Sequence, residues 1–166
     1  MYVAIRVMVG GPDDVDAAVD VYVRSGTARH RGERMLHARI EQVRDTIRRD
    51  ESWLFAADDD GERLGMAVAM PSREDFGAGP LVPGLCYLDL IFVVPERWGE
   101  GIGALLLDSV SSDARLRGFS RIHLLSHDDN SRAQALYRSR GFALTGWSHA
   151  ASDPTQGAVS EWSRDL

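Results

Sequence analysis

Alternating glycines between an apolar segment and a helix-like segment constrain this chain more than any other feature. The stretch reads Val93-Val94-Pro95-Glu96-Arg97-Trp98-Gly99-Glu100-Gly101-Ile102-Gly103-Ala104-Leu105-Leu106-Leu107. A β-branched run that stops at proline, followed by glycines and then leucines, predicts a strand, a tight loop and a helix. The first amides of a helix have no acceptor within the helix, and they carry a partial positive charge. The stretch therefore predicts that a phosphate-bearing ligand binds there.

Glycines in this pattern also occur in P-loops, in Rossmann sites and in turns that serve only backbone sterics. A P-loop needs a lysine after its glycines, and all nineteen basic residues of this chain are arginine. A Rossmann site needs a glycine at position 104 and an acidic residue on the next strand, but the chain has Ala104 and no acid in 122–126. A glycine-rich turn that serves only backbone sterics stays open as an alternative.

Composition bounds the class of protein. The 166 residues suit one domain with a single core, and the net charge of −6 argues against general affinity for nucleic acid. Cys86 is the only cysteine, which excludes an internal disulfide and a cysteine-based zinc site, and we expect no metal. No signal peptide or membrane span is recognisable, so the sequence predicts a soluble, cytoplasmic protein.

Periodicity gives the expected order of elements. Strands are expected over 5–9, 53–57, 63–70, 87–94, 122–126, 142–148 and 158–162. Helices are expected from about residue 15, and over 33–49, 101–117 and 131–140. The Gly- and Pro-rich stretch 71–84 is predicted to be a flexible loop. This order predicts a single-domain, mixed α/β (α+β) fold over residues 1–166, with about seven mostly antiparallel strands flanked by about four helices.

A second motif follows about thirty residues after the glycine loop. It reads Asn130-Ser131-Arg132-Ala133-Gln134-Ala135-Leu136-Tyr137-Arg138-Ser139-Arg140-Gly141-Phe142. Together the two motifs resemble the GNAT superfamily of acyl-CoA-dependent N-acyltransferases. The first is similar to the pyrophosphate loop of that family, and the second is similar to its Asn…Ala…Leu-Tyr…Gly-Phe signature. The resemblance implies a GNAT-like fold and acetyl-CoA as co-substrate.

The resemblance also implies which residues bind the cofactor. Main-chain groups of Ile91, Phe92 and Val93 would pair with the pantetheine arm. The pyrophosphate would lie on residues 98–104, namely Trp98, Gly99, Glu100, Gly101, Ile102, Gly103 and Ala104, and Asn130, Ala133 and Tyr137 would complete the set. Two positions depart from the family pattern: Trp98 stands where the family usually has Arg or Gln, and Glu100 where a basic residue is common.

Two residues are the candidate catalytic groups. Tyr137 holds the signature tyrosine, whose hydroxyl in the family lies near the thioester sulfur, and it is the candidate acid; a core tyrosine is the structural alternative. Asp89 is the only carboxylate within the apolar strand 87–94 and is the candidate base, because a buried carboxylate needs a reason. A structural partner such as an arginine would explain Asp89 equally well, and His123 and His127 are further candidates for the base.

The functional prediction is an N-acetyltransferase that moves acetyl from acetyl-CoA directly to a primary amine of a small molecule or peptide. The alternative is a module that binds acyl-CoA without turnover, because Leu125 stands where some relatives carry a glutamate. A homodimer is in keeping with the family. The sequence leaves open the acceptor, the length of the acyl chain, whether the base is a side chain or water, and the oligomeric state.

Overall fold

The computed structural model describes residues 4–29, 36–150 and 157–166. Within these ranges it contains seven strands and four α-helices. The strands are β1 (Arg6–Val9), β2 (Trp53–Asp59), β3 (Glu62–Arg73), β4 (Leu81–Val93), β5 (Arg121–His127), β6 (Ala143–Ala150) and β7 (Ala158–Asp165). The helices are α1 (Val15–Arg29), α2 (His37–Arg48), α3 (Ile102–Leu116) and α4 (Ser131–Ser139). The order along the chain is the one predicted, although residues 33–35 of the expected second helix lie outside the described ranges.

The strands form a mixed sheet in the hydrogen-bonded order β1-β2-β3-β4-β5-β7-β6. The β4–β5 pairing is parallel, whereas β1–β2, β2–β3, β5–β7 and β6–β7 are antiparallel. The predicted mixed α/β fold is therefore confirmed. The chain divides into two compact units, one of residues 1–70 with 90–110 and one of residues 71–89 with 111–166. Strand β4 belongs partly to each unit.

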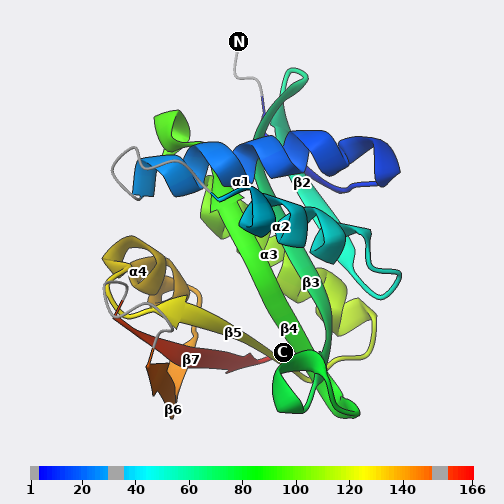
Figure 1. Ribbon diagram of the computed structural model, residues 1–166, viewed down its shortest axis with the longest axis vertical. Helices are drawn as coiled ribbons and strands as arrows, with labels where there is room; N and C mark the ends of the chain where they lie inside the picture. Colours follow the sequence, from blue (N-terminus) through cyan, green and yellow to red (C-terminus); the bar gives the residue numbers. More distant parts are fainter. Residues whose placement is uncertain (1–3, 30–35, 151–156) are drawn as a thin grey trace. The chain divides into compact units, whose positions relative to one another are not determined.

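The core of the first unit lies between helices on the two faces of its strands (Figure 1). Helices α1 and α2 cover one face, and α3 covers the other. Every residue of β3 from Leu64 to Met70 is buried, which is the pattern of a strand covered on both faces. On α3, Ile102, Leu106 and Val110 form the fully buried stripe. Each such side chain contributes about 1.5–3 kcal/mol when it leaves water.

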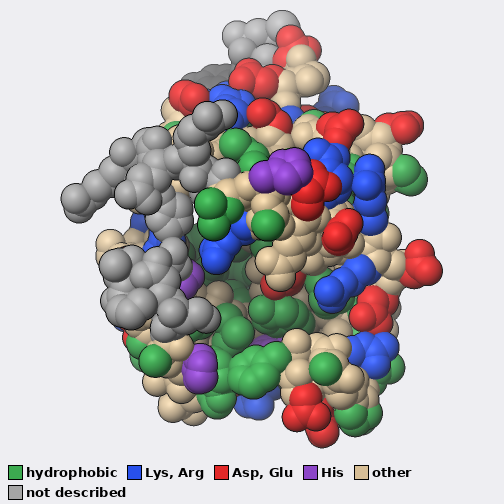
Figure 2. Space-filling model, viewed as in Figure 1, with side chains coloured by type: hydrophobic (Ala, Val, Ile, Leu, Met, Phe, Trp, Pro, Cys, Tyr) green, Lys and Arg blue, Asp and Glu red, His purple; other side chains and the backbone are tan. Residues whose placement is uncertain are grey.

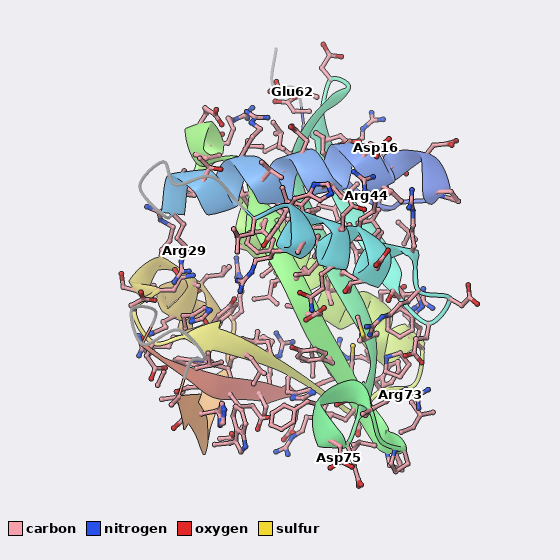
Figure 3. All side chains as sticks on the ribbon, in the orientation of Figure 1. Asp16, Arg29, Arg44, Glu62, Arg73 and Asp75 are labelled. Carbon is pink, nitrogen blue, oxygen red and sulfur yellow. The ribbon has the colours of Figure 1, made fainter. Side chains whose placement is uncertain are left out.

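An ion pair joins α1 to α2. The Arg44 guanidinium binds the Asp16 carboxylate, and the two labelled side chains point toward one another in Figure 3. Glu41, three residues before Arg44 on the same helix, lies 3.6 Å from the Arg44 Nε. Because Asp16 is exposed, solvent screens the pair, and the buried stripe of α1 holds the helix in place.

The core of the second unit is built on the β4–β5 pairing. Cys86 is opposite Ile122 and Leu88 is opposite Leu124, and all four side chains are buried. Along both strands the alternate residues point the other way, as the pleat requires. Cys86 is thus a packing residue of this core.

The stretch 71–84 differs from the predicted flexible loop. Strand β3 continues to Arg73 and β4 begins at Leu81, so only residues 74–80 connect them, with a short 3₁₀ turn at Asp75–Gly77. The prediction from the sequence was wrong here because Gly84 lies inside strand β4, where it allows close packing against Ser120, and does not mark a loop. Its φ is +72°, and a Cβ there would lie 2.9 Å from Ser120 Oγ, so glycine lets the two backbones approach and Gly84 O accept from Ser120 N.

The close approach of α3 to β3 depends on Gly65. A Cβ added there would lie 2.9 Å from Leu106 Cδ1 and 3.1 Å from the Phe92 carbonyl oxygen. We predict that Gly65→Ala lowers the free energy of unfolding by about 1–3 kcal/mol through overpacking, as measured by chemical denaturation. Gly11→Ala is the matched control, because no atom lies within 4 Å of its Cβ position. Equal stability of the two variants would contradict the prediction.

Candidate functional site

The glycine loop leaves amide donors exposed at the start of α3. Gly99 and Gly101 have φ values of +86° and +83°, which disfavour any residue with a Cβ although space for one is open. The first helical bond runs from Leu105 N to Gly101 O. The amides of residues 102–104 precede that donor, so the helix supplies no acceptor for them. They form a main-chain site of the kind that binds phosphate oxygens.

The guanidinium nearest this loop is held by carboxylates. Arg97 Nε donates to Glu100 Oε2 at 2.6 Å, and Arg97 Nη2 donates to Asp59 Oδ2 at 3.3 Å. The hydrogen bond with Glu100 raises the pKa of Arg97, so the guanidinium is charged but already paired. Any anion at the loop therefore depends on the main-chain donors more than on this side chain.

Trp98 ties the loop back to the end of β4. Its indole Nε1 donates to the Val93 carbonyl oxygen at 2.8 Å. A carbonyl oxygen has two lone pairs, and this bond uses one of them. The neighbouring Phe92 ring packs edge-on against Tyr22 of α1, with ring centroids 5.1 Å apart. The predicted cofactor-binding residues 91–93 are thus half-buried and packed at the same time.

The second motif forms α4, and Asn130 caps it. The Asn130 side-chain oxygen accepts from Ala133 N at 3.3 Å, and its own amide donates to His127 O at 3.0 Å. This geometry satisfies one of the amides that a helix start leaves bare. The cap role, which is the structural alternative for an asparagine at this position, is therefore present.

Tyr137 lies inside the second unit with 5% of its surface exposed. Its ring is 6.1 Å from those of Phe142 and of Trp162, centroid to centroid. These contacts pack the ring on two sides, and the hydroxyl is the polar group of the side chain. Packing and a role in proton transfer are therefore compatible.

Asp89 has a tyrosine as a partner. The Tyr87 hydroxyl donates to the Asp89 carboxylate, and the two residues lie on the same face of β4. Burial first, and then the Asp89 charge, raise the pKa of Tyr87 well above its usual range. Tyr87 therefore stays protonated and keeps donating to Asp89.

A hydrogen-bonded chain of three side chains lies beside this pair. Ser72 Oγ is 2.8 Å from His123 Nε2, and His123 Nδ1 is 2.8 Å from Glu161 Oε2. The sequence offered His123 as a candidate base but gave no reason to select Ser72 or Glu161. The signal lies in the register of β5 against β7, which pairs Leu125 with Glu161 and so brings Glu161 to the face of His123.

Aromatic side chains gather at the surface of the second unit. Phe76 is 83% exposed, and its ring centroid lies 5.9 Å from Trp147 and 6.4 Å from His149. Trp147 and His149 stack with an angle of 18° between their planes. Figure 2 shows hydrophobic and histidine side chains close together in the lower part of this face. We call Phe76, Trp147 and His149 the aromatic cluster.

Two further findings concern the described ranges only. No group of three or more His, Cys, Asp or Glu side chains in them could hold a metal ion. No helix among these residues has the length and apolarity that a membrane crossing requires.

Comparison with known proteins relates these features to a family. The sequence profile of the Acetyltransferase (GNAT) family matches residues 16–142. The mycothiol acetyltransferase of Beutenbergia cavernae is 30% identical over 108 residues, which is 62% of this chain and 33% of that protein. The match thus spans about a third of the length of this curated relative.

Solved structures share the fold. The ribosomal-protein-alanine N-acetyltransferase of Brucella melitensis superposes with a TM-score of 0.73 at 20% identity, covering 97% of this chain and 99% of that one. The PaiA N-acetyltransferase of Thermoplasma acidophilum, solved in complex with coenzyme A, gives a TM-score of 0.68 at 16% identity over 95% and 98%. At these identities the likeness concerns the fold.

The Asn130 cap can be tested by its effect on stability. We predict that Asn130→Ala lowers the free energy of unfolding by about 1 kcal/mol, because Ala133 N loses its acceptor, whereas Asn130→Asp keeps the cap. Thermal and chemical denaturation of both variants measure this. An Asn130→Ala variant as stable as the parent would show that the cap is dispensable.

Proposed function

Since the chain belongs to the acetyltransferase (GNAT) family, we propose that it transfers an acetyl group from acetyl-CoA to a primary amine of a small molecule or peptide. The observation that carries the proposal is the start of α3, where the helix offers its first amides no acceptor, behind two glycines of positive φ. In the proposed reaction the amine nitrogen attacks the thioester carbon, the C–S bond breaks, and coenzyme A leaves as the thiol. Transfer is direct, within a complex of both substrates.

We further propose the contacts of the donor, with no metal. The amides of the glycine loop bind the pyrophosphate, and main-chain groups near the end of β4 pair with the pantetheine arm. Coenzyme A in the Thermoplasma acidophilum relative supports this cofactor. The full set of proposed contacts is Ile91, Phe92, Val93, Trp98, Gly99, Glu100, Gly101, Ile102, Gly103, Ala104, Asn130, Ala133 and Tyr137.

Tyr137 is the proposed acid and Asp89 the proposed base. An alkylammonium has a pKa near 10, so roughly one molecule in a thousand is nucleophilic near neutrality, and a proton acceptor must raise that fraction. The Asp89 carboxylate, which accepts a hydrogen bond from Tyr87, is the proposed acceptor. The departing thiolate needs a proton, and a buried tyrosine hydroxyl can donate it.

The proposed acceptor is a cationic amine. Asp89 supplies negative charge, and the aromatic cluster supplies ring faces that attract ammonium groups. Asp128 and Asp129, both exposed at the end of β5, add to the negative charge of the second unit. Beyond a positively charged nitrogen, these features select no particular acceptor.

A second candidate is a module that binds acyl-CoA without turnover. The pairing of Arg97 with two carboxylates favours it, because this guanidinium is then less available to the pyrophosphate. We also propose that residues 1–166 form one N-acetyltransferase domain, that the protein works in the cytoplasm and that it forms a homodimer.

Thiol release from acetyl-CoA over a panel of primary amines tests the function. We expect amine-dependent release of coenzyme A and an N-acetyl product by mass spectrometry. Calorimetric binding of coenzyme A without release on any amine would favour the non-catalytic module. No binding of coenzyme A by folded protein would contradict both candidates.

The role of Tyr137 has a separate test. We predict that Tyr137→Phe lowers kcat by about 10²–10⁴, because the thiolate then leaves without a proton donor. Calorimetry should find the affinity for coenzyme A little changed, since the ring and its packing remain. Unchanged kcat would remove Tyr137 from the chemistry.

The negative charge of Glu100 at the glycine loop can be tested by a variant that is expected to bind coenzyme A more tightly. We predict that Glu100→Gln raises the affinity for coenzyme A several-fold, because the change removes a negative charge beside the phosphates and weakens the attraction that holds Arg97. Asp113→Asn is the matched control: it makes the same change in net charge at the other end of α3. If both variants bind coenzyme A equally well, the effect of Glu100 is not local.

A further inference from the structure

We propose that the chain of Ser72, His123 and Glu161 is a second proton acceptor of the reaction. It takes one of the two protons that the acceptor nitrogen loses and carries it toward solvent. The inference rests on the proposed function and deepens it, because it assigns a route to a proton that Asp89 and Tyr137 leave unassigned.

The hydrogen bonds among Ser72, His123 and Glu161 indicate which atom donates and which accepts. A carboxylate accepts, so a neutral imidazole here has its hydrogen on Nδ1 and donates it to Glu161 at 2.8 Å. Nε2 is then a lone pair, and it accepts the Ser72 hydroxyl hydrogen at 2.8 Å. The Ser72 oxygen keeps its own lone pairs for a third group. The chain is therefore poised to accept a proton at Ser72.

Burial gives the chain a direction. Ser72, near the end of β3, has 4% of its surface exposed. The exposed fraction rises to 14% for the His123 side chain and to 26% for that of Glu161 on β7. A proton that enters at Ser72 thus moves from the interior toward water.

The stoichiometry of amide formation calls for such a group. The nitrogen loses one proton before it attacks and a second one as the amide forms, while the sulfur gains one. With Asp89 alone, the carboxylate must release the first proton before it takes the second. With a second proton acceptor, the second proton can leave the nitrogen before Asp89 has released the first.

The proposed proton transfer balances. A proton passes from the nitrogen to Ser72 Oγ as the serine's own proton passes to His123 Nε2, and the nitrogen keeps the electron pair. The product is an imidazolium that faces the Glu161 carboxylate, which stabilises its charge. Solvent then takes the proton.

The two acceptors lie around one side chain. The Tyr87 ring centroid is 5.0 Å from that of His123, and the Tyr87 hydroxyl donates to Asp89. Tyr87 and His123 are also direct partners in the β4–β5 register. Among the described residues, Tyr87 and Glu161 are titratable groups in contact with His123, and Asp89 is hydrogen-bonded to Tyr87. An amine bound beside Tyr87 would lie close to both proposed proton acceptors, Asp89 and the group of Ser72, His123 and Glu161.

Kinetics as a function of pH test the relay. We expect Ser72→Ala and His123→Gln to lower kcat at least about tenfold near neutrality, with the KM for acetyl-CoA unchanged. The loss should shrink as the pH approaches the pKa of the amine, because less of the amine then needs a base. Ser72→Thr keeps the hydroxyl and should retain most of the activity. Ser163→Ala is the matched control, because Ser163 is the β7 partner of His123 in the register.

The outcomes separate the two proposals. A parent protein that transfers no acetyl to any amine overturns the proposed function and the relay with it. A parent that transfers acetyl, while His123→Gln keeps its kcat or loses the same factor at every pH, overturns the relay alone. An acetyl adduct on Ser72 would also overturn it, in favour of a nucleophilic serine. Melting temperatures and coenzyme A binding verify that each variant is folded.

Nitrogen NMR of the His123 ring adds a readout that needs no substrate. We expect a hydrogen on Nδ1 and none on Nε2 near neutrality, and a shift of that pattern in Glu161→Gln. A ring protonated on both nitrogens over the working pH range would overturn the relay, because an imidazolium accepts no proton.

Discussion

The packing of α3 on Gly65 is the constraint on which the candidate donor site depends. Leu106 and the Phe92 carbonyl oxygen occupy the space where a side chain at position 65 would lie, so helix and strands approach closely. Ile102, the first residue of α3, is buried with them, and this fixes where the helix begins. The amides of residues 102–104 are held by the core of the first unit, and anion binding there costs no further ordering.

Electrostatics at the loop are balanced rather than strongly positive. Arg97 brings a charge to the glycine loop, but Glu100 and Asp59 take up its hydrogen bonds. Trp98, which stands in place of a basic residue, makes its bond to the strand that it follows. The loop is thus held rigid by its own side chains, and main-chain dipoles remain as the source of attraction for phosphate.

Polar groups in the second unit are organised by strand pairing. Tyr87, Asp89 and His123 share a face of β4 and β5, and Glu161 and Ser72 join them from β7 and β3. Every hydrogen bond described in this group has a carboxylate or an imidazole as one member, so each is stronger than a bond between neutral groups when the charge is present. A buried network of this kind is stable only when its members are satisfied, and here they satisfy one another.

Local sequence determined the order of elements, the glycine loop, the start of α3 and the Asn130 cap, because each depends on residues close together in the chain. It erred at 71–84, where Gly84 serves a contact with Ser120 rather than a turn. Tertiary structure alone brought Asp59 to Arg97, 38 positions away, and brought Ser72 and Glu161 to the two ring nitrogens of His123. Those contacts depend on strand register, and a shift of one residue would turn each side chain to the opposite face.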